Sequence, residues 1–340
     1  MCISCVRRSY VYQLLYAGDA AIFLARERRH VMALPLRFGI LAPQVVPYDV
    51  QVERWRELDE YGFDSLWFAD HFVNPARPSG RWFESQTLMA AAAVQTERIR
   101  IGALVTSITI RHPALFAKET LTLDHISGGR IELGIGAAGA PNDMGMTGLP
   151  EWETLERARR FRDFVRMVHA LLVGEPSEEG GINYDGAYYQ ATEAVMDPGP
   201  VQLPRPPFTL AAAGPVNMKF AARMAESWNQ VPSDANGGWR LSIDECLDQV
   251  RRQNEQMDEF CSEAGRDPST LRRSVLAGGG VTPDNIWGSE EQFRDFVGRY
   301  MEAGVDEFLF YYPSRVEQGD GWYERIAREV IPELKAGAAI

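Results

Sequence analysis

The chain has few cysteines, few histidines and less positive than negative charge. Of its 340 residues, 35 are basic and 47 are acidic, which gives a formal net charge of −12. A nucleic-acid-binding protein needs a basic face to offset phosphate charge, so this balance argues against a nucleic-acid partner. No stretch is long and apolar enough to cross a bilayer as a helix. We therefore expect a cytoplasmic protein without a membrane partner.

Only four cysteines are present, and two of them, Cys2 and Cys5, form a CxxC motif. No second pair follows at the spacing of a zinc site, which needs a complete set of ligands. We interpret the cysteines as reduced, incidental thiols and expect no metal site.

The first 31 residues differ from the rest of the chain. Five arginines surround a mixed apolar run that Asp19 interrupts, and no clear small-residue cleavage site follows. A secretory signal is therefore not favoured. Because a good strand pattern begins directly after Met32, we predict an N-terminal extension outside the fold over residues 1–31 and a single domain over residues 32–340. A short appended helix is the alternative for the extension.

From Leu36 onward, short apolar segments alternate with amphipathic helical patterns. Eight βα units in series predict a parallel sheet closed into a (β/α)8 TIM barrel, with an open doubly wound sheet as the alternative. Two longer segments, 137–151 after the fourth strand and 174–206 before the fifth, are expected to be insertions. The predicted strands are 37–41, 65–69, 100–106, 131–135, 208–212, 228–230, 271–277 and 307–310.

In such barrels the active site lies at the carboxyl ends of the strands. Three of these ends are clusters of glycine and alanine, at 136–139, 213–215 and 278–280. Small residues allow a flat ligand or a phosphate to approach the backbone. Glycine at these positions can alternatively be needed only for the backbone conformation of the loop. The amides after Ala213 open a predicted helix, which favours an anion there.

Asp70 and His71 form the one titratable pair at a strand end early in the chain. His71 is well placed for acid–base chemistry near neutral pH, with a structural histidine in the barrel mouth as the alternative. For Asp70, a catalytic role and a capping role are equally open. By contrast, Asp124 and residues 127–130 precede the fourth strand, at the end of a barrel where residues serve stability.

Several sequence blocks together resemble the luciferase-like monooxygenase family, in consistent order from about Leu36 to Pro313. The blocks are Gly62–Trp67 (GFDSLW), Ala69–His71 (ADH), Thr96–Gly102 (TERIRIG), Arg111–Ala114 (RHPA), Leu123–Gly136 (LDHISGGRIELGIG) and Gly199–Pro204 (GPVQLP). The resemblance implies a (β/α)8 barrel with insertions that binds either FMN or coenzyme F420, a deazaflavin. The sequence Asp70-His71-Phe72 is more similar to the F420-dependent branch.

The resemblance also implies a set of cofactor contacts. His71 corresponds to a histidine near the reactive ring carbon. Leu104, Val105 and Thr106 correspond to a segment against the back of the ring, which in relatives often contains a non-proline cis peptide; we predict one between Leu104 and Val105. The remaining matched positions are Gly136, Ala138 and Asn142 in the loop after the fourth strand, and Ala213, Gly214 and Pro215 beside the ribityl or phosphate part.

Two positions depart from the sugar-phosphate dehydrogenases of the family. Gly139 stands where that branch has a glutamate acid, with Asp143 four residues later, and Pro75 stands where it has a tryptophan. We therefore do not expect glucose-6-phosphate to be the substrate. The strand ends carry aromatic residues and few charges, which favours a partly apolar small molecule.

The functional hypothesis is F420-dependent hydride transfer to or from a small organic substrate, with His71 and Asp70 as the candidate catalytic residues. One alternative is an FMN-dependent monooxygenase that uses reduced flavin and oxygen and needs a flavin reductase as partner. Another is a flavin-binding protein without turnover. Family resemblance further implies a homodimer.

Overall fold

The computed structural model describes residues 34–137, 141–234, 240–278, 281–282, 285–313 and 321–338. The predicted extension over residues 1–31 lies outside these residues, so its separation from the domain stays a prediction. No helix in the described parts of the chain is long and apolar enough to cross a membrane.

Strands and helices alternate along the chain, as the sequence pattern predicts. The strands are β1 (Arg37–Leu41), β2 (Ser65–Phe68), β3 (Arg100–Ala103), β4 (Thr106–Ser107), β5 (Ile131–Gly136), β6 (Ile182–Asp185), β7 (Gln190–Ala194), β8 (Phe208–Ala211), β9 (Ser227–Gln230), β10 (Arg272–Ala277) and β11 (Glu307–Tyr311). The helices are α1 (Tyr48–Tyr61), α2 (Ser85–Gln95), α3 (Pro113–Ser127), α4 (Pro141–Thr147), α5 (Thr154–Val173), α6 (Pro215–Met224), α7 (Ile243–Glu263), α8 (Glu290–Glu302), α10 (Trp322–Arg325) and α11 (Ile331–Ala338), with a 3-10 turn η1 (Pro268–Thr270) and a π-helical turn η2 (Ile326–Val330).

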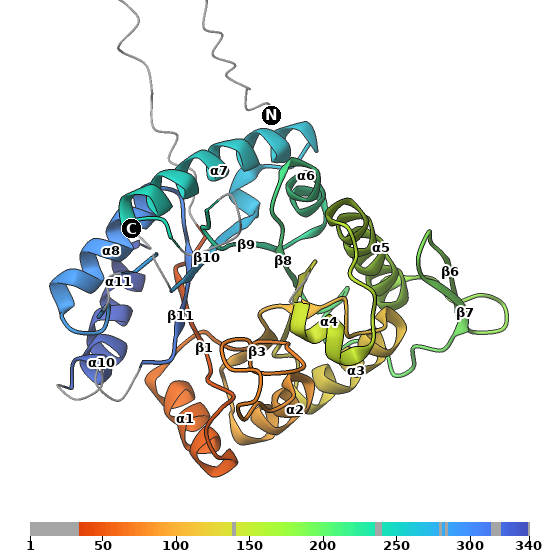
Figure 1. The fold of residues 1–340 in the computed structure, drawn as a ribbon, viewed down its shortest axis with the longest axis horizontal. Helices are drawn as coiled ribbons and strands as arrows, with labels where there is room; N and C mark the ends of the chain where they lie inside the picture. The colour runs from red at the N-terminus through yellow and green to blue at the C-terminus, as the bar shows by residue number, and fades with distance from the viewer. Residues whose placement is uncertain are drawn as a thin grey trace, which may run out of the picture. The chain divides into compact units, whose positions relative to one another are not determined.

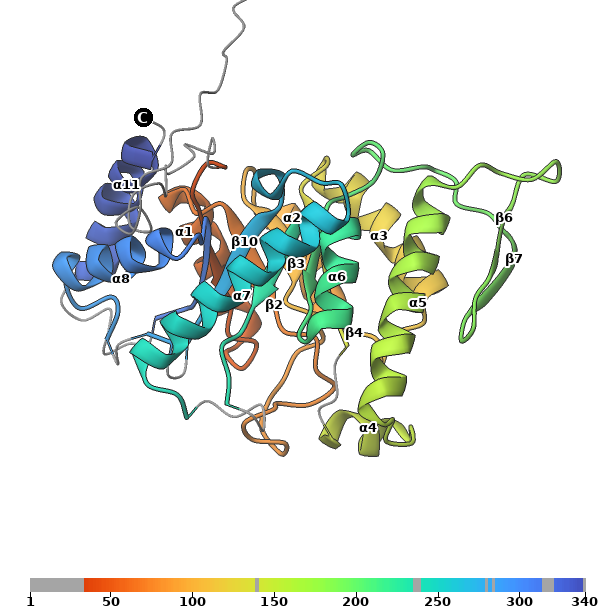
Figure 2. The ribbon, with the colours of Figure 1, turned by 90° about the horizontal axis from the view of Figure 1, so that it is seen from above.

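The main sheet is a closed parallel barrel. Its strands follow the order β3-β2-β1-β11-β10-β9-β8-β5, and pairing of β3 with β5 closes the ring. In Figure 1 the strands lie inside a ring of helices, and Figure 2 shows the same arrangement from above. The predicted (β/α)8 barrel is therefore confirmed, and the open doubly wound alternative is excluded.

Local differences from the sequence pattern occur where the chain leaves the barrel. The third predicted strand is divided, because β3 ends at Ala103 and β4 resumes at Thr106. The first expected insertion, 137–151, contains the short helix α4. The second insertion, 174–206, forms the hairpin β6–β7 beside α5 (Figures 1 and 2).

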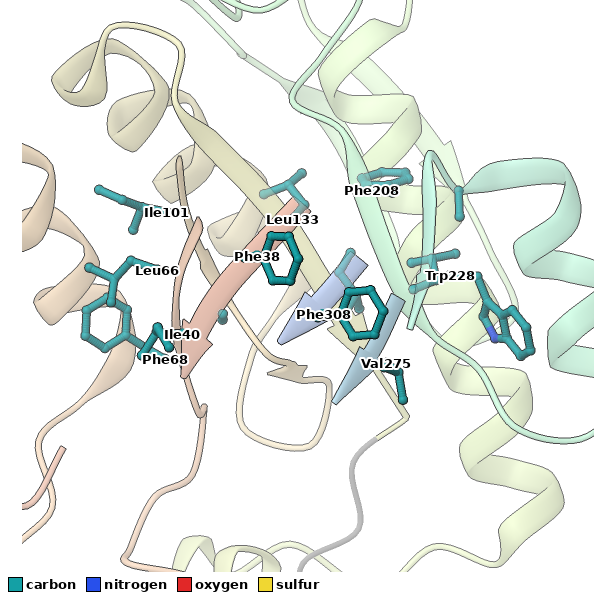
Figure 3. Close-up of a cluster of buried hydrophobic side chains, with 14 of the residues drawn as sticks. Phe38, Ile40, Leu66, Phe68, Ile101, Leu133, Phe208, Trp228, Val275 and Phe308 are labelled. Carbon is teal, nitrogen blue, oxygen red and sulfur yellow. The ribbon is translucent and has the colours of Figure 1, made fainter. Parts of the chain in front are cut away.

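The main core lies between the barrel and its helices. Trp55, Phe63 and Phe68 are almost fully buried. Burial of each such aromatic side chain contributes about 1.5–3 kcal/mol to folding. Figure 3 shows part of this core along the strands, including Phe38 and Trp228. This layer fixes the strands and leaves their carboxyl ends open for a site.

An ion-pair network fills the amino-terminal end of the barrel interior. Glu132 is buried, and its carboxylate accepts hydrogen bonds from Arg37, at 2.6 Å, and from Arg100. Burial by itself raises the pKa of Glu132, but the two guanidinium groups outweigh that effect and the net pKa is lowered. The network therefore holds an ionised carboxylate inside the barrel.

The motif before β5 serves structure, as the sequence analysis expects for this end of the barrel. The buried Asp124 carboxylate accepts hydrogen bonds from the backbone of Val201 and Gln202. The Arg130 guanidinium donates to four backbone carbonyls, including those of Ala93 and Ile99. These contacts tie the segment before β8 and the end of α2 to the barrel.

We expect Gly102→Ala to lower the free energy of unfolding by about 1–3 kcal/mol, because the added β-carbon would meet the Trp67 ring and the backbone oxygen of Glu132. Denaturant unfolding followed by circular dichroism measures the effect. Gly298→Ala in α8 is the matched control, since nothing lies within 4 Å of its added β-carbon. It should stabilise the protein by about 0.5–1 kcal/mol. An equal change in the free energy of unfolding of Gly102→Ala and Gly298→Ala would contradict the packing argument.

Glu132→Gln should lower the free energy of unfolding at pH 7 by about 1–3 kcal/mol, because it removes the charge that meets the partly buried guanidinium groups of Arg37 and Arg100. The folded pKa of Glu132 is lowered, so its stabilisation is present above the ordinary carboxyl pKa and is lost as the pH falls through the folded value. The difference between wild type and variant should therefore shrink in acid. The exposed Glu97→Gln serves as control, and a pH-independent difference would contradict this account.

Candidate functional site

The carboxyl-terminal mouth of the barrel has an apolar floor. Leu41, Trp67, Leu104, Leu276 and Leu309 form a buried cluster inside the barrel that is separate from the main core, with Ala69 and Val105 packed against it. The Trp67 indole nitrogen donates to Ser65 Oγ at 2.8 Å, so its ring is fixed below the mouth. A flat, partly apolar molecule fits such a floor better than a highly charged one.

The segment after β3 forms one side of this floor. The peptide bond between Leu104 and Val105 is cis, which confirms the prediction made from the family resemblance. Leu104 is buried, Val105 is half-buried, and Thr106 pairs with Ile135 of β5. A β-carbon at Gly136 would collide with the Val105 side chain, so the structure brings these predicted residues together.

His71 lies at the mouth, just after β2, and pairs with Asp143. Its Nδ1 is 2.7 Å from Asp143 Oδ2, and the side chains are 31% and 3% exposed, respectively. A carboxylate only accepts hydrogen bonds, so Nδ1 carries the hydrogen. Among the residues that the structure describes, His71 Nε2 has no hydrogen-bond partner. The geometry therefore leaves Nε2 as the nitrogen that can meet a ligand.

Asp143 is itself held by the backbone after His71. Its Oδ1 accepts hydrogen bonds from the amides of Phe72, at 3.0 Å, and Val73, at 3.4 Å. On the other side, Trp82 Nε1 donates to the His71 carbonyl at 3.0 Å. The sequence pattern alone gives Asp143 no role. An acidic residue in the first turn of a helix close to a strand end is the signal that could have found it.

Asp70 lies beside His71 but has a different environment. Both oxygens of its buried carboxylate accept hydrogen bonds from Arg111, at 3.0 and 2.6 Å. Ser85 Oγ and the Ser107 amide donate to the same carboxylate at 2.7 and 3.0 Å. Sequence left a catalytic role and a capping role open for Asp70, and these contacts instead favour an anchor that ties the end of β2 to α2 and β4.

The predicted phosphate-side residues open helix α6. Ala213 and Pro215 are exposed, and Gly214 is the N-cap residue with a φ of 73°, which favours glycine. No side chain caps this helix, so its first amides have no side-chain acceptor. Free amides at a helix N-terminus suit a phosphate oxygen. Asn142 is exposed on α4, whereas Ala138 lies outside the described residues.

Aromatic side chains stand at the rim above the floor. Phe72 and Tyr311 are 55% and 40% exposed. Gly278 lies directly beneath the Tyr311 ring, because a β-carbon there would collide with it. Burial raises the pKa of Tyr311 to about 12, so its hydroxyl stays protonated near neutral pH. The rim thus offers aromatic surface and a neutral hydroxyl.

The tyrosines of the second insertion pack on α5. Tyr184 donates to Asp163 Oδ1 at 2.6 Å, and the amides of Tyr188 and Tyr189 donate to its other oxygen. The hairpin therefore covers the outer face of α5 and does not contribute these groups to the mouth.

The mouth as a whole fits a flavin or deazaflavin. The apolar floor and the Val105–Gly136 contact suit a planar ring, His71 Nε2 can reach a reacting group, and the uncapped α6 amides suit a phosphate.

Comparisons with known proteins agree with this geometry. The model of the luciferase-like monooxygenase family matches residues 29–331. An F420-dependent glucose-6-phosphate dehydrogenase from Beutenbergia cavernae is 32% identical over 315 residues, which cover 82% of this chain and 91% of the relative. The corresponding enzyme from Amycolatopsis mediterranei is 30% identical over 235 residues, or 68% of this chain and 67% of the relative.

A solved structure shares the fold. It is an F420-dependent secondary alcohol dehydrogenase in complex with an F420-acetone adduct, with a TM-score of 0.71 and 20% identity, over 88% of this chain and 99% of that one. The family match spans most of the chain, and the barrel and mouth agree with it. The chain therefore belongs to the luciferase-like monooxygenase family and is a luciferase-like oxidoreductase.

Proposed function

We propose that this protein is a coenzyme F420-dependent oxidoreductase that transfers a hydride to or from a small, partly apolar organic substrate. The observation that carries the proposal is the hydrogen bond between His71 Nδ1 and Asp143, which fixes an imidazole at the barrel mouth. The F420 dependence named for relatives at 30% and 32% identity supports the choice of cofactor.

A bound deazaflavin supplies a ring carbon that accepts or donates a hydride, while the protein supplies orientation and proton handling. Leu104, Val105, Thr106 and Gly136 would support the ring. Asn142 would contact it from α4, Ala138 stays a contact expected from the family resemblance, and Ala213, Gly214 and Pro215 would hold the phosphate side.

His71 is the proposed acid–base residue. Because Nδ1 donates to Asp143, Nε2 is free to accept the proton of a substrate hydroxyl when the adjacent carbon loses a hydride. In the reverse direction Nε2 returns that proton to a carbonyl oxygen. Asp143 fixes the ring and stabilises the imidazolium, whereas Asp70 holds the segment through Arg111 and has both oxygens occupied.

The substrate differs from a sugar phosphate in this proposal. Pro75 and Gly139 replace the tryptophan and glutamate expected in the glucose-6-phosphate branch. The exposed Phe72 and Tyr311 at the rim add apolar surface. We therefore expect secondary alcohols, ketones or unsaturated compounds of modest polarity to be turned over in preference to glucose-6-phosphate.

Titration of the purified protein with F420, with oxidised FMN and with reduced FMN, followed by fluorescence or absorbance, tests the cofactor. We expect selective binding of F420. Selective FMN binding would instead favour the monooxygenase that uses reduced flavin, oxygen and a reductase partner. Tight cofactor binding without turnover across a broad substrate panel would favour a flavin-binding protein, and binding of neither cofactor would overturn the assignment.

His71→Ala should lower kcat by about 10²–10⁴-fold, because the general acid–base group is removed. Steady-state kinetics with the best substrate of the panel measures the change, and circular dichroism checks folding. His125→Ala is the matched control, since His125 is exposed near the carboxyl end of α3 and its Nε2 hydrogen-bonds the Gly199 carbonyl. Unchanged turnover in a folded His71→Ala variant would rule out the assignment.

Asp143→Asn should keep an acceptor for the Phe72 amide but lose the carboxylate that fixes the hydrogen on His71 Nδ1. We expect the ¹⁵N NMR signals of the ring to show a mixture of tautomers, with turnover between that of wild type and that of His71→Ala. Asp143→Glu should restore part of the activity, because the carboxylate is retained. A wild-type tautomer ratio in Asp143→Asn would contradict the proposed role.

A further inference from the structure

Three arginines form a row on one face of helix α5. Arg159, Arg162 and Arg166 follow a spacing of three and four residues, which places them one above another on a helix. We call them the arginine row. No ion pair joins any of them to an acidic residue within the described parts of the chain, although Arg160 on the same helix pairs with Glu156 at 2.8 Å. The row is thus a concentrated positive charge in a chain with a net charge of −12.

The row lies beside the start of α6. Arg162 Nη1 donates to Asn217 Oδ1 at 2.8 Å, and Asn217 is the third residue of α6. Figures 1 and 2 both show α5 next to α6. With a rise of about 1.5 Å per helical residue, Asn217 lies about 4.5 Å along the helix from Gly214. The row therefore borders the uncapped amides that would hold the phosphate.

The acidic groups near the row are already engaged. Glu156 is taken by Arg160, and Asp163 accepts hydrogen bonds from the Tyr184 hydroxyl and two amides. Helix α6 contains no acidic residue and adds Lys219, which pairs with Glu263 on α7. Within the described residues, the acidic groups of α5 and α6 therefore leave the row open to an anionic ligand.

The charges of the row act on one another. Burial lowers the pKa of Arg162, and the neighbouring charges of Arg166 and Arg159 lower it further. Arg166 also lies over the Phe220 ring at 5.3 Å, which holds its guanidinium against α6. An anion placed along the row would relieve this repulsion and gain charge-assisted hydrogen bonds.

We propose that the arginine row binds the anionic tail of the deazaflavin cofactor and selects F420 over FMN. FMN ends in a phosphate monoester, whereas F420 continues from its phosphate into a chain that carries several carboxylates. From Arg159 to Arg166 the row extends about 10 Å along α5, enough for successive carboxylates to meet separate guanidinium groups. The inference rests on the proposed function, because it assigns a binding surface for the cofactor of that same site.

Equilibrium binding, rather than turnover, tests the row. Wild type and Arg159→Gln/Arg166→Gln are titrated with F420 that carries several glutamates and with a deazaflavin that lacks phosphate and tail. The control is Arg157→Gln/Arg223→Gln, which removes the same charge from another face of α5 and the far end of α6. Arg162 is left intact because it bonds Asn217.

We expect the arginine-row variant to lose about tenfold or more in affinity for tailed F420, with a weaker salt dependence. Its affinity for the tail-free deazaflavin should stay at the wild-type value, which also shows that the variant is folded. An equal loss in the control variant, or equal wild-type affinity for the tailed and tail-free compounds, would overturn the inference while leaving the proposed function standing. Binding of neither compound by wild type would overturn both.

Discussion

Closure of the barrel between β3 and β5 is the constraint on which the site depends. The register pairs Ile101 with Ile131 and Gly102 with Glu132, and it places β3 beside two neighbours at once. A β-carbon at Gly102 would meet the Trp67 ring, and one at Gly134 would meet the backbone of Ala103. Only small residues at these points let Trp67 fill the interior. The chain then leaves β3 at Leu104 and returns as β4, which opens the mouth above the packed layer.

Two neighbouring carboxylates show how environment separates structural from chemical roles. Asp70 is saturated by Arg111, Ser85 and Ser107, so it has no free lone pair directed to a ligand. Asp143 uses one oxygen for backbone amides and the other for His71. The first carboxylate fixes the segment, and the second fixes the hydrogen on an imidazole. The aspartate adjacent to His71 in sequence is therefore not the one that orients it.

The two ends of the barrel differ in whether their charged groups have partners of opposite charge. At the amino-terminal end, Glu132 is compensated by Arg37 and Arg100, so burial of charge is balanced inside the protein. At the carboxyl-terminal end, the uncapped start of α6 and the arginine row leave positive potential uncompensated by described side chains. Balanced charge serves stability, whereas uncompensated positive charge suits an anionic ligand.

The sequence by itself determined the order and type of the barrel elements, because apolar strands and amphipathic helices have distinct periods that a local window reveals. It also located His71 and the small-residue strand ends, and the resemblance to a family supplied the cis peptide at Leu104–Val105. The sequence did not reveal that His71 pairs with Asp143, because the two residues are 72 positions apart. It also did not reveal helix α4, which carries Asp143. Only the tertiary structure decided which carboxylate meets which partner, because hydrogen bonds between strand ends depend on barrel closure and not on local pattern.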